Sequence, residues 1–183
     1  STIASNVVTG ALVIAMELML PYRREWQRSH GDVRIDLSHF ILSAGSGQLI
    51  AAVPLWGLGL FSARLSAALG AGLWPAGLPL GLQVVIALLL ADFSSYWLHR
   101  LFHSTALWRL HVIHHSAPRL YWLNSYRNHP GEVVLSIVLM TGPLVALGAG
   151  ERVLALFTSI AFAIMVLQHS NIAMKLGLMN ALF

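Results

Sequence analysis

The sequence contains no cysteine and few charged residues. Of its 183 residues, 10% are Asp, Glu, Lys or Arg and 57% are hydrophobic, whereas soluble domains carry about 25% charged residues. Without cysteine, the chain can form neither disulfides nor thiolate metal sites, so histidine becomes the leading candidate metal ligand. This composition excludes an ordinary soluble protein and indicates an integral membrane protein that crosses the bilayer several times.

Other signals are also missing. The net charge is +4, but the basic residues are sparse, nearly all Arg and next to apolar runs, which is typical of membrane flanks and does not predict a nucleic-acid partner. There is no P-loop, dinucleotide-binding glycine motif, H-E-x-x-H motif or Glu-x-x-His pair of the soluble di-iron bundles. No basic segment precedes the first apolar run, so we expect no cleaved signal peptide. The chain begins at Ser1 without Met and ends in an apolar segment, so we expect further residues at both ends.

Long apolar runs predict an all-α, polytopic membrane protein with about four to five membrane-embedded helices in a single domain, residues 1–183. The expected helices cover residues 3–20, 37–61, 79–103, 132–149 and 151–167. The connection 22–36 carries four Arg and should lie on the cytoplasmic side, whereas the connection 62–78 should lie on the far side. This orientation brings every histidine pair or cluster to the cytoplasmic side, as a histidine-rich cap.

Three polar residues lie early in the chain, away from the main histidine cluster. Glu17 is in the last turn of the first helix, and we expect it to pair with Arg23 or Arg24, with a role in a substrate or proton path as the alternative. His30 and His39 have no partner at ligand spacing, so we interpret both as interfacial or structural.

Six of the nine histidines lie between Asp92 and Pro130, at His99, His103, His111, His114, His115 and His129. His99 and His103 are spaced i, i+4 and lie on one helix face, about 6 Å apart along the axis. The next three form an H-x-x-H-H box, which again has the spacing of metal ligands.

A shared metal site requires the chain to turn between these two boxes. One straight helix would separate them by roughly 24 Å, whereas metals in a two-metal site lie about 3.5 to 4 Å apart. Ser104 and Thr105 can cap a new helix that begins near Ala106. We therefore predict a sharp turn at these residues.

Asp92 lies seven residues before His99, on the same helix face. A carboxylate inside a membrane needs a partner, and the free N–H of a metal-ligating imidazole would provide one. We expect Asp92 to support a ligand in this way, with a bond to Ser95, Tyr96 or an arginine as the alternative.

Two further histidines can reach the same site. His129 precedes Pro130, which biases it away from helical geometry, and it could act as a ligand or support one. His169 ends the last predicted helix, close to Gln168 and Asn171, and we expect it to bind metal. Imidazole ligands suit Fe, Zn, Cu and Ni, so ligand type alone leaves the metal open.

Four segments together resemble the fatty acid hydroxylase/sterol desaturase superfamily of membrane di-iron enzymes: DFSSYWLHRLFH, HVIHH, NSYRNHPGE and QHSN. They occur in the family's order and span roughly the C-terminal half of the chain. The resemblance implies a helical fold with a cytoplasmic histidine-rich cap, two Fe ions, for which Zn can substitute in a purified sample, O2 as co-substrate and a separate electron-donor protein. It implies metal binding by His99, His103, His111, His114, His115 and His169, with His129 as a further candidate. The family has another H-x-x-H-H box after QHSN, which is absent up to Phe183.

The residues and the resemblance together predict O2-dependent hydroxylation or desaturation of a C–H bond on a lipid-like molecule, of fatty acyl, sterol or carotenoid type. Five aromatic residues could line its path or serve as interface anchors and core packing: Trp97, Phe102, Trp108, Tyr121 and Trp122. A metal-binding or metal-transporting membrane protein is the main alternative, but it predicts polar residues spread through the bilayer depth. A b-type haem carrier would use only two histidines, and a purely structural role would use none.

Overall fold

The computed structural model describes residues 1–174 and 177. In this part of the chain all regular elements are helices, and the only β-type pairing is an isolated bridge between Pro21 and Ile172. The predicted all-α fold is therefore confirmed. The apolar end, residues 176–183, from which we expected further chain, lies outside the described residues apart from residue 177.

Five described helical segments are long and apolar enough to cross a membrane, as predicted. They are α1 (Thr2–Met19), the segment Asp32–Leu69, α4 (Leu80–Ser104), α6 (Pro130–Leu147) and α7 (Glu151–Gln168). The second of these is longer than expected at both ends and comprises α2 (Asp32–Ser38), a π-helical turn η2 (His39–Ala44) and α3 (Gly45–Leu69). The segment begins after Gly31 and ends before Gly70, and both glycines adopt left-handed backbone angles, φ 84° and 68°. It is this long because no residue between them breaks the helix.

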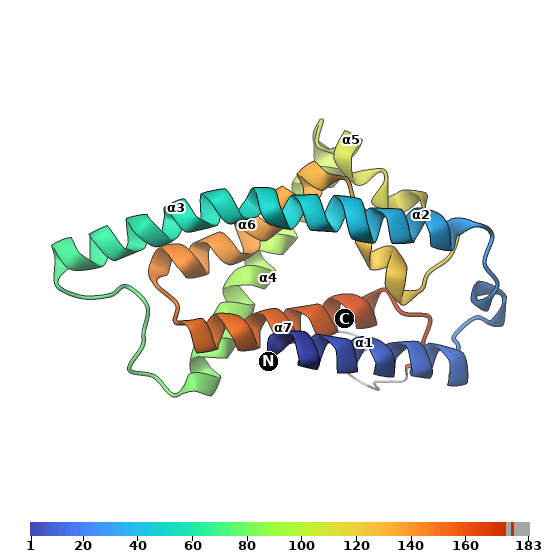
Figure 1. Cartoon of the computed structure of the whole chain (residues 1–183), viewed down its shortest axis with the longest axis horizontal. Coiled ribbons are helices and arrows are strands. Elements are labelled where there is room, and N and C mark those ends of the chain that lie inside the picture. Colours follow the sequence, from blue (N-terminus) through green and yellow to red (C-terminus); the bar gives the residue numbers. More distant parts are fainter. Residues whose placement is uncertain (175–176, 178–183) are drawn as a thin grey trace.

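Four of the membrane-length segments form two parallel pairs, which Figure 1 shows running lengthwise through the molecule. In the first pair, Gly47 and Gly59 of α3 lie next to Val133 and Val145 of α6. In the second, the ends of α1 and α7 are joined by two backbone hydrogen bonds, from Tyr22 N–H to the Asn171 carbonyl (3.1 Å) and from Ala173 N–H to the Leu20 carbonyl (2.9 Å).

Helix α4 crosses both pairs at a steep angle (Figure 1). Its small residues Ala87 and Ala91 are buried in the main core, where they pack with Leu144 of α6 and Val153 and Phe157 of α7. Close packing at these alanines fixes the direction of α4, and thereby the place where its C-terminal histidines emerge.

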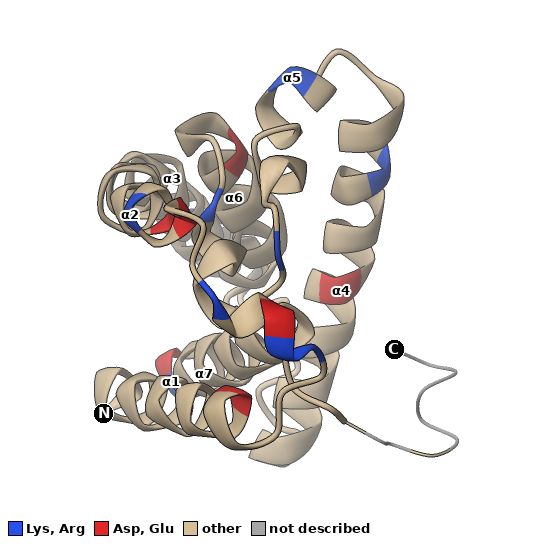
Figure 2. Ribbon diagram, turned by 90° about the vertical axis from the view of Figure 1, so that its right-hand side faces the viewer, with Lys and Arg blue, Asp and Glu red and all other residues tan. Residues whose placement is uncertain are grey.

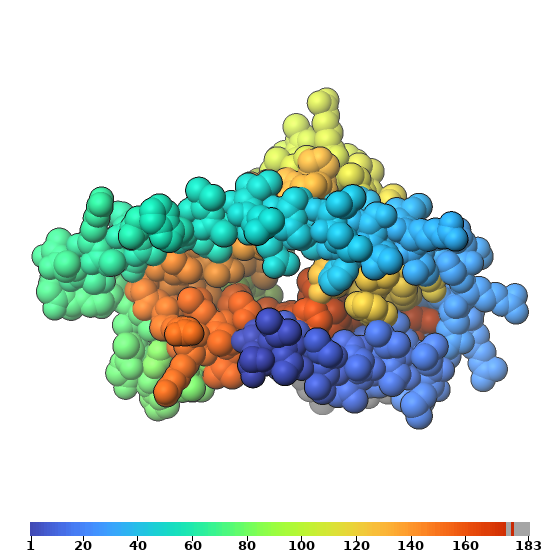
Figure 3. All heavy atoms as spheres, in the orientation of Figure 1, coloured from blue at the N-terminus to red at the C-terminus, as the bar shows by residue number. Residues whose placement is uncertain are grey.

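The remaining elements are short and connect the long helices. They are η1 (Arg24–Gln27), α5 (Trp108–His111), η3 (His114–Ser116) and η4 (Trp122–Tyr126). Figure 2 shows charged residues on α2, on α5 and on the connection between α1 and α2. In the space-filling view an opening separates the α2–α3 rod from the α1/α7 pair (Figure 3).

Candidate metal centre

The chain turns sharply after α4, as predicted. Helix α4 ends at Ser104, and the hydroxyl oxygen of Thr105 accepts the Leu107 N–H at 3.2 Å. The next helix begins at Trp108 rather than near Ala106. Ser104 does not cap it because the Ser104 hydroxyl donates back to the Arg100 carbonyl (2.7 Å).

The turn brings together four histidines, His99, His103, His111 and His115, which we call the four-histidine cluster. One ligand nitrogen from each lies within 4.8 Å of the other three. The Nε2 atoms of His99 and His103 are 3.1 Å apart, and those of His111 and His115 are also 3.1 Å apart. Two bonds of about 2.1 Å between an ion and imidazole nitrogens span ligand atoms up to about 4.2 Å apart. The four nitrogens, within 4.8 Å of one another, form a group that could hold one metal ion.

Aromatic side chains surround the four-histidine cluster. Phe102 is buried and stacks on the His111 ring with centroids 5.0 Å apart. Trp108 lies 5.3 Å from the His103 ring and 5.5 Å from the His115 ring. Of the five aromatic residues predicted to line the substrate path or to pack, these two contact the cluster directly.

A buried carboxylate fixes one of the four ligands. Glu132, in the first turn of α6, accepts a hydrogen bond from His111 Nδ1 at 2.7 Å, and both side chains are buried. Because Nδ1 carries the proton, the Nε2 lone pair of His111 is free to bind metal. Glu132 ends the NSYRNHPGE segment, where its local sequence predicts no role for it. The available signal was an acidic residue at the start of an apolar helix.

His114 and His169 form a second nitrogen pair beside the cluster. Their Nε2 atoms are 3.2 Å apart, although the residues are 55 positions apart in the sequence. The Nδ1 of His169 donates to the Met165 carbonyl (2.8 Å), which leaves its Nε2 free. The His114 and His111 rings are 5.3 Å apart, centroid to centroid. The pair therefore offers two further nitrogen ligands next to the four-histidine cluster.

The histidines of this centre that lie outside the membrane-length helices favour the neutral form. Burial, reinforced by the neighbouring imidazoles, lowers the pKa of His111 to about 3 and that of His114 to about 4. Burial also lowers the pKa of His115 and of His169. Neutral imidazole is the form that binds metal, so this environment favours ligation over protonation.

Cavities flank both groups of histidines. One, of about 410 Å³, adjoins the His114–His169 pair and is also lined by polar side chains of Arg119, Asn124 and Gln168. The other, also of about 410 Å³, is lined by Asp92, Ser95, Tyr96, His99 and Arg100. A small substrate group or a water molecule could therefore approach the centre from two sides.

For two predicted site residues, the described residues show no hydrogen bond to these groups, although Asp92 lines the same cavity as His99. Asp92 is exposed rather than buried, and within the described residues it makes no hydrogen bond to an imidazole. His129 caps α6, with its Nδ1 accepting the Gly131 N–H at 3.0 Å. The role of Asp92 beside His99 and the ligand role of His129 stay predictions.

The expected pairing of Glu17 with Arg23 or Arg24 is wrong. The Glu17 carboxylate is buried, and its Oε1 accepts the backbone N–H groups of Trp122 and Asn171, each at 2.8 Å. The Nη1 atom of Arg23 instead lies 3.8 Å from the Oε1 atom of Glu25. Glu17 therefore joins α1 to the loop after the H-x-x-H-H box and to the end of α7, near His169.

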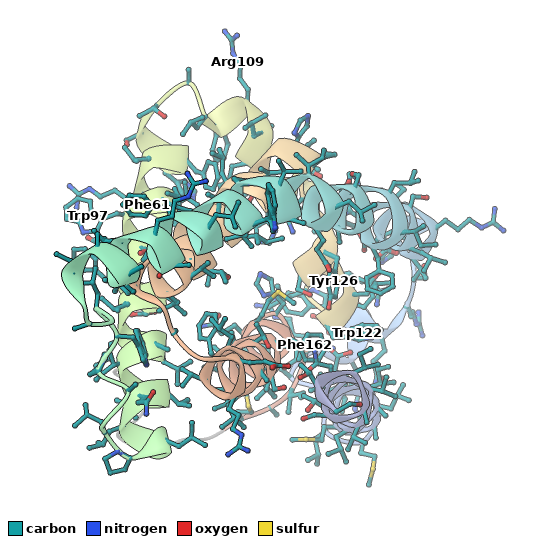
Figure 4. All side chains as sticks on the ribbon, turned by 60° about the vertical axis from the view of Figure 1, so that its left-hand side comes forward. Phe61, Trp97, Arg109, Trp122, Tyr126 and Phe162 are labelled. Carbon is teal, nitrogen blue, oxygen red and sulfur yellow. The ribbon has the colours of Figure 1, made fainter. Side chains whose placement is uncertain are left out.

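His39, Trp97 and Trp122 lie outside the two groups of histidines. His39 Nδ1 lies 3.0 Å from the Ser43 hydroxyl and 3.1 Å from the Asn128 carbonyl, as expected for a structural residue. Figure 4 shows Trp97 at the outside of the bundle. In the same view Trp122 lies with Tyr126 and Phe162 between the two helix pairs. Trp122 and Phe162 pack there against the core of Val13, Val166 and Ile172.

A fold of membrane-length helices that gathers six imidazoles is the arrangement of a membrane protein with a candidate metal centre. The sequence profile of the fatty acid hydroxylase family matches residues 84–183, more than half of the chain and all the histidines of the centre. The chain belongs to this family. It is 33% identical, over 186 aligned residues and 97% of its length, to the ornithine lipid hydroxylase OlsE of Rhizobium tropici. The chain spans 56% of the length of that relative. No solved structure matches the chain significantly.

Proposed function

We propose that this protein is a multi-pass membrane di-iron hydroxylase that inserts one oxygen atom from O2 into a C–H bond of a lipid. The observation that carries this proposal is the convergence of histidines from α4, from the turn after it and from the end of α7. Nothing in helix packing alone requires six imidazoles in contact, whereas two neighbouring metal ions would use them as ligands. Membership of a hydroxylase family supports the same conclusion.

The residues suit two iron ions at different positions. The four-histidine cluster would hold the first, and the His114–His169 pair would contribute to the second. When bound, the irons would supply the activation of O2. The protein groups orient the ligands, since Glu132 holds the His111 ring and the Met165 carbonyl holds the His169 ring. Phe102 packs against the His111 ring, and Trp108 packs against the His115 ring.

We propose an amino-acid-containing membrane lipid of the ornithine lipid type as the first substrate to test. The similar protein from Rhizobium tropici is named for hydroxylation of ornithine lipid. Hydroxylation is favoured over desaturation because both the family and this relative carry that activity in their names. The two electrons that an O2-dependent hydroxylation consumes would come from a separate electron-donor protein.

We place the histidine centre on the cytoplasmic side. The connection between α1 and α2 carries Arg23, Arg24 and Arg28, and arginine-rich connections favour the cytoplasm. The backbone bonds between the ends of α1 and α7 bring His169 to the side of this connection. Five crossings in sequence also place the turn after α4 and the end of α7 on the same side.

The function can be tested with lipids extracted from cells that express the protein under labelled O2. We expect a lipid product that gains one oxygen atom, derived from O2, and that is lost in His111→Ala. His30→Ala is the matched control, because His30 is an exposed histidine outside the centre. A product that has lost two hydrogens without gaining oxygen would replace hydroxylation by desaturation. No change in any lipid with a loaded metal centre would contradict the proposal.

A further inference from the structure

Helix α2 and the turn η2 carry four polar residues on one face: Asp32, Asp36, His39 and Ser43. Their spacings of four, three and four residues match the helical repeat, so all four point the same way. We call this set the polar stripe. It lies outside residues 84–183, the part of the chain that the family profile matches.

The carboxylates of the polar stripe bind two buried arginines from the segment after the H-x-x-H-H box. Arg119 Nε donates to Asp32, and Arg127 Nε donates to Asp36. The hydroxyl of Tyr121 also donates to Asp36, at 2.6 Å. Asp36 has no solvent exposure, and both arginines are buried. These arginines therefore do not serve as membrane-flank charges, contrary to the interpretation from sequence.

The polar stripe reaches both ends of this segment. At one end, Arg127 Nη1 donates to the carbonyl of Ser116, at 3.4 Å. Ser116 ends the short helix η3, which begins with His114 and His115. At the other end, His39 Nδ1 lies 3.1 Å from the Asn128 carbonyl, next to His129.

Buried ion pairs of this kind contribute specificity of geometry rather than much net stability. Removing two charges from water costs about as much as their attraction returns, but a buried pair tolerates only one arrangement. The segment between Ser116 and Asn128 contains one regular element, the short helix η4, and Glu17 also binds it at Trp122. The bonds from the polar stripe therefore help to set the position of η3.

We infer that the polar stripe is a positioning device, which through Arg127 and Ser116 sets His114 against His169 at the second metal position. This inference rests on the proposed function, because it assumes that the His114–His169 pair binds metal. Residues from the N-terminal half of the chain would then help to determine whether the centre holds two ions or one. Asp36 and Arg127 touch no metal in this account and act through the backbone of η3.

The test is the double variant Asp36→Leu/Arg127→Met, titrated anaerobically with Fe(II) or Co(II) in detergent. Replacing both charges by apolar residues leaves no unpaired buried charge, so the fold can survive. We expect the double variant to keep its helical content and to fill the four-histidine cluster. Metal affinity at the second metal position should fall by about tenfold to a hundredfold, which is the usual effect of disturbing groups that orient metal ligands. Arg34→Met, an exposed arginine on the same helix, should bind both ions as the wild type does.

A second variant decides the question if the double variant does not fold. Tyr121→Phe removes only the hydroxyl that donates to Asp36, and we expect it to fold and to weaken the second position alone. Unchanged binding of both ions in the folded double variant, or in Tyr121→Phe if only that variant folds, would overturn the inference while leaving the proposed function intact. A wild-type protein that binds no metal would overturn both.

Discussion

Glu132 shows how one buried carboxylate can control a metal ligand. It lies 21 residues beyond His111 in the sequence, yet the two side chains meet at 2.7 Å in the interior. The bond selects the tautomer of His111 and fixes its ring, and both effects raise the affinity of Nε2 for metal. The sequence predicts that Asp92 supports a ligand on α4, and the structure adds Glu132, which binds the His111 ring of α5.

Removing this carboxylate should weaken the first metal position. We expect Glu132→Ala to lower metal affinity at the four-histidine cluster by about tenfold to a hundredfold. Glu132→Gln should lower this metal affinity less, because the amide oxygen can still accept a hydrogen bond from His111 Nδ1. Titration with Co(II), followed by its absorbance, measures both changes.

Glu151→Gln is the control for this prediction, since Glu151 is exposed in the first turn of α7 and far from the histidines in sequence. Its metal affinity should equal that of the wild type. If Glu132→Ala also bound metal as tightly as the wild type, the hydrogen bond to His111 would have no role in ligation.

Residue types could be predicted from sequence better than residue partners. Histidines at i, i+4 spacing and an H-x-x-H-H box already indicated His99, His103, His111 and His115. The partners of Glu17 and Glu132 could not be read in the same way, because their bonds join residues 105, 154 and 21 positions apart. Which backbone N–H or ring nitrogen a carboxylate reaches depends on how the helices pack.

At the scale of elements, the close approach of α3 and α6 places the start of α6 beside the centre. A Cβ on Gly47 would lie 2.5 Å from Val133 Cγ1 and 2.6 Å from Val133 Cβ. Only glycine allows the two helices to come this close at the turn of α6 that follows His129 and carries Glu132.

We therefore expect Gly47→Ala to lower the free energy of unfolding by about 1–3 kcal/mol, because an added methyl group overpacks the interface. Metal affinity should fall as well, since α6 must shift. Gly45→Ala is a close control, because no described atom outside its own helix lies within 4 Å of the position where its Cβ would be. It should leave stability unchanged or raise it by up to about 1 kcal/mol, as alanine favours helix over glycine. Equal thermal unfolding midpoints for the two variants would contradict this account of the interface.

The membrane-length helices themselves could be predicted well, because each is a long apolar run with a clear end. The predicted bounds of the first, third and last helices agree with the structure within one residue, and those of the fourth agree within two. The second was predicted to begin too late because its polar first turns, from Asp32 to Ser38, resemble a connection. These turns are helical because the carboxylates of the polar stripe bind arginines of a distant segment. No local sequence pattern reveals those partners.

At the scale of the whole molecule, the absence of cysteine allows a direct test of orientation. Single cysteines at Arg24, Gly72 and Arg109 can be labelled with a membrane-impermeant maleimide in intact cells and in inverted vesicles. We expect Arg24→Cys and Arg109→Cys to react only from the cytoplasmic side and Gly72→Cys only from the other side. These three positions lie in connections between the long helices or in the short helix α5, and all are exposed.

The opposite result for Arg109→Cys alone would place the turn after α4 on the far side and would remove α4 as a crossing. Reversal of all three would keep the topology and change only the side of the histidines. The wild-type chain, which has no cysteine, serves as the unlabelled control.

The convergence of distant histidines is the central claim, and metal stoichiometry tests it most directly. Purified wild-type protein should be titrated anaerobically with Fe(II), in parallel with His111→Ala and His169→Ala. We expect two ions per chain in the wild type, loss of the ion at the four-histidine cluster in His111→Ala, and loss of one ion with retention of the other in His169→Ala. Fewer than one ion per chain in the wild type, or unchanged binding in both variants, would contradict the account.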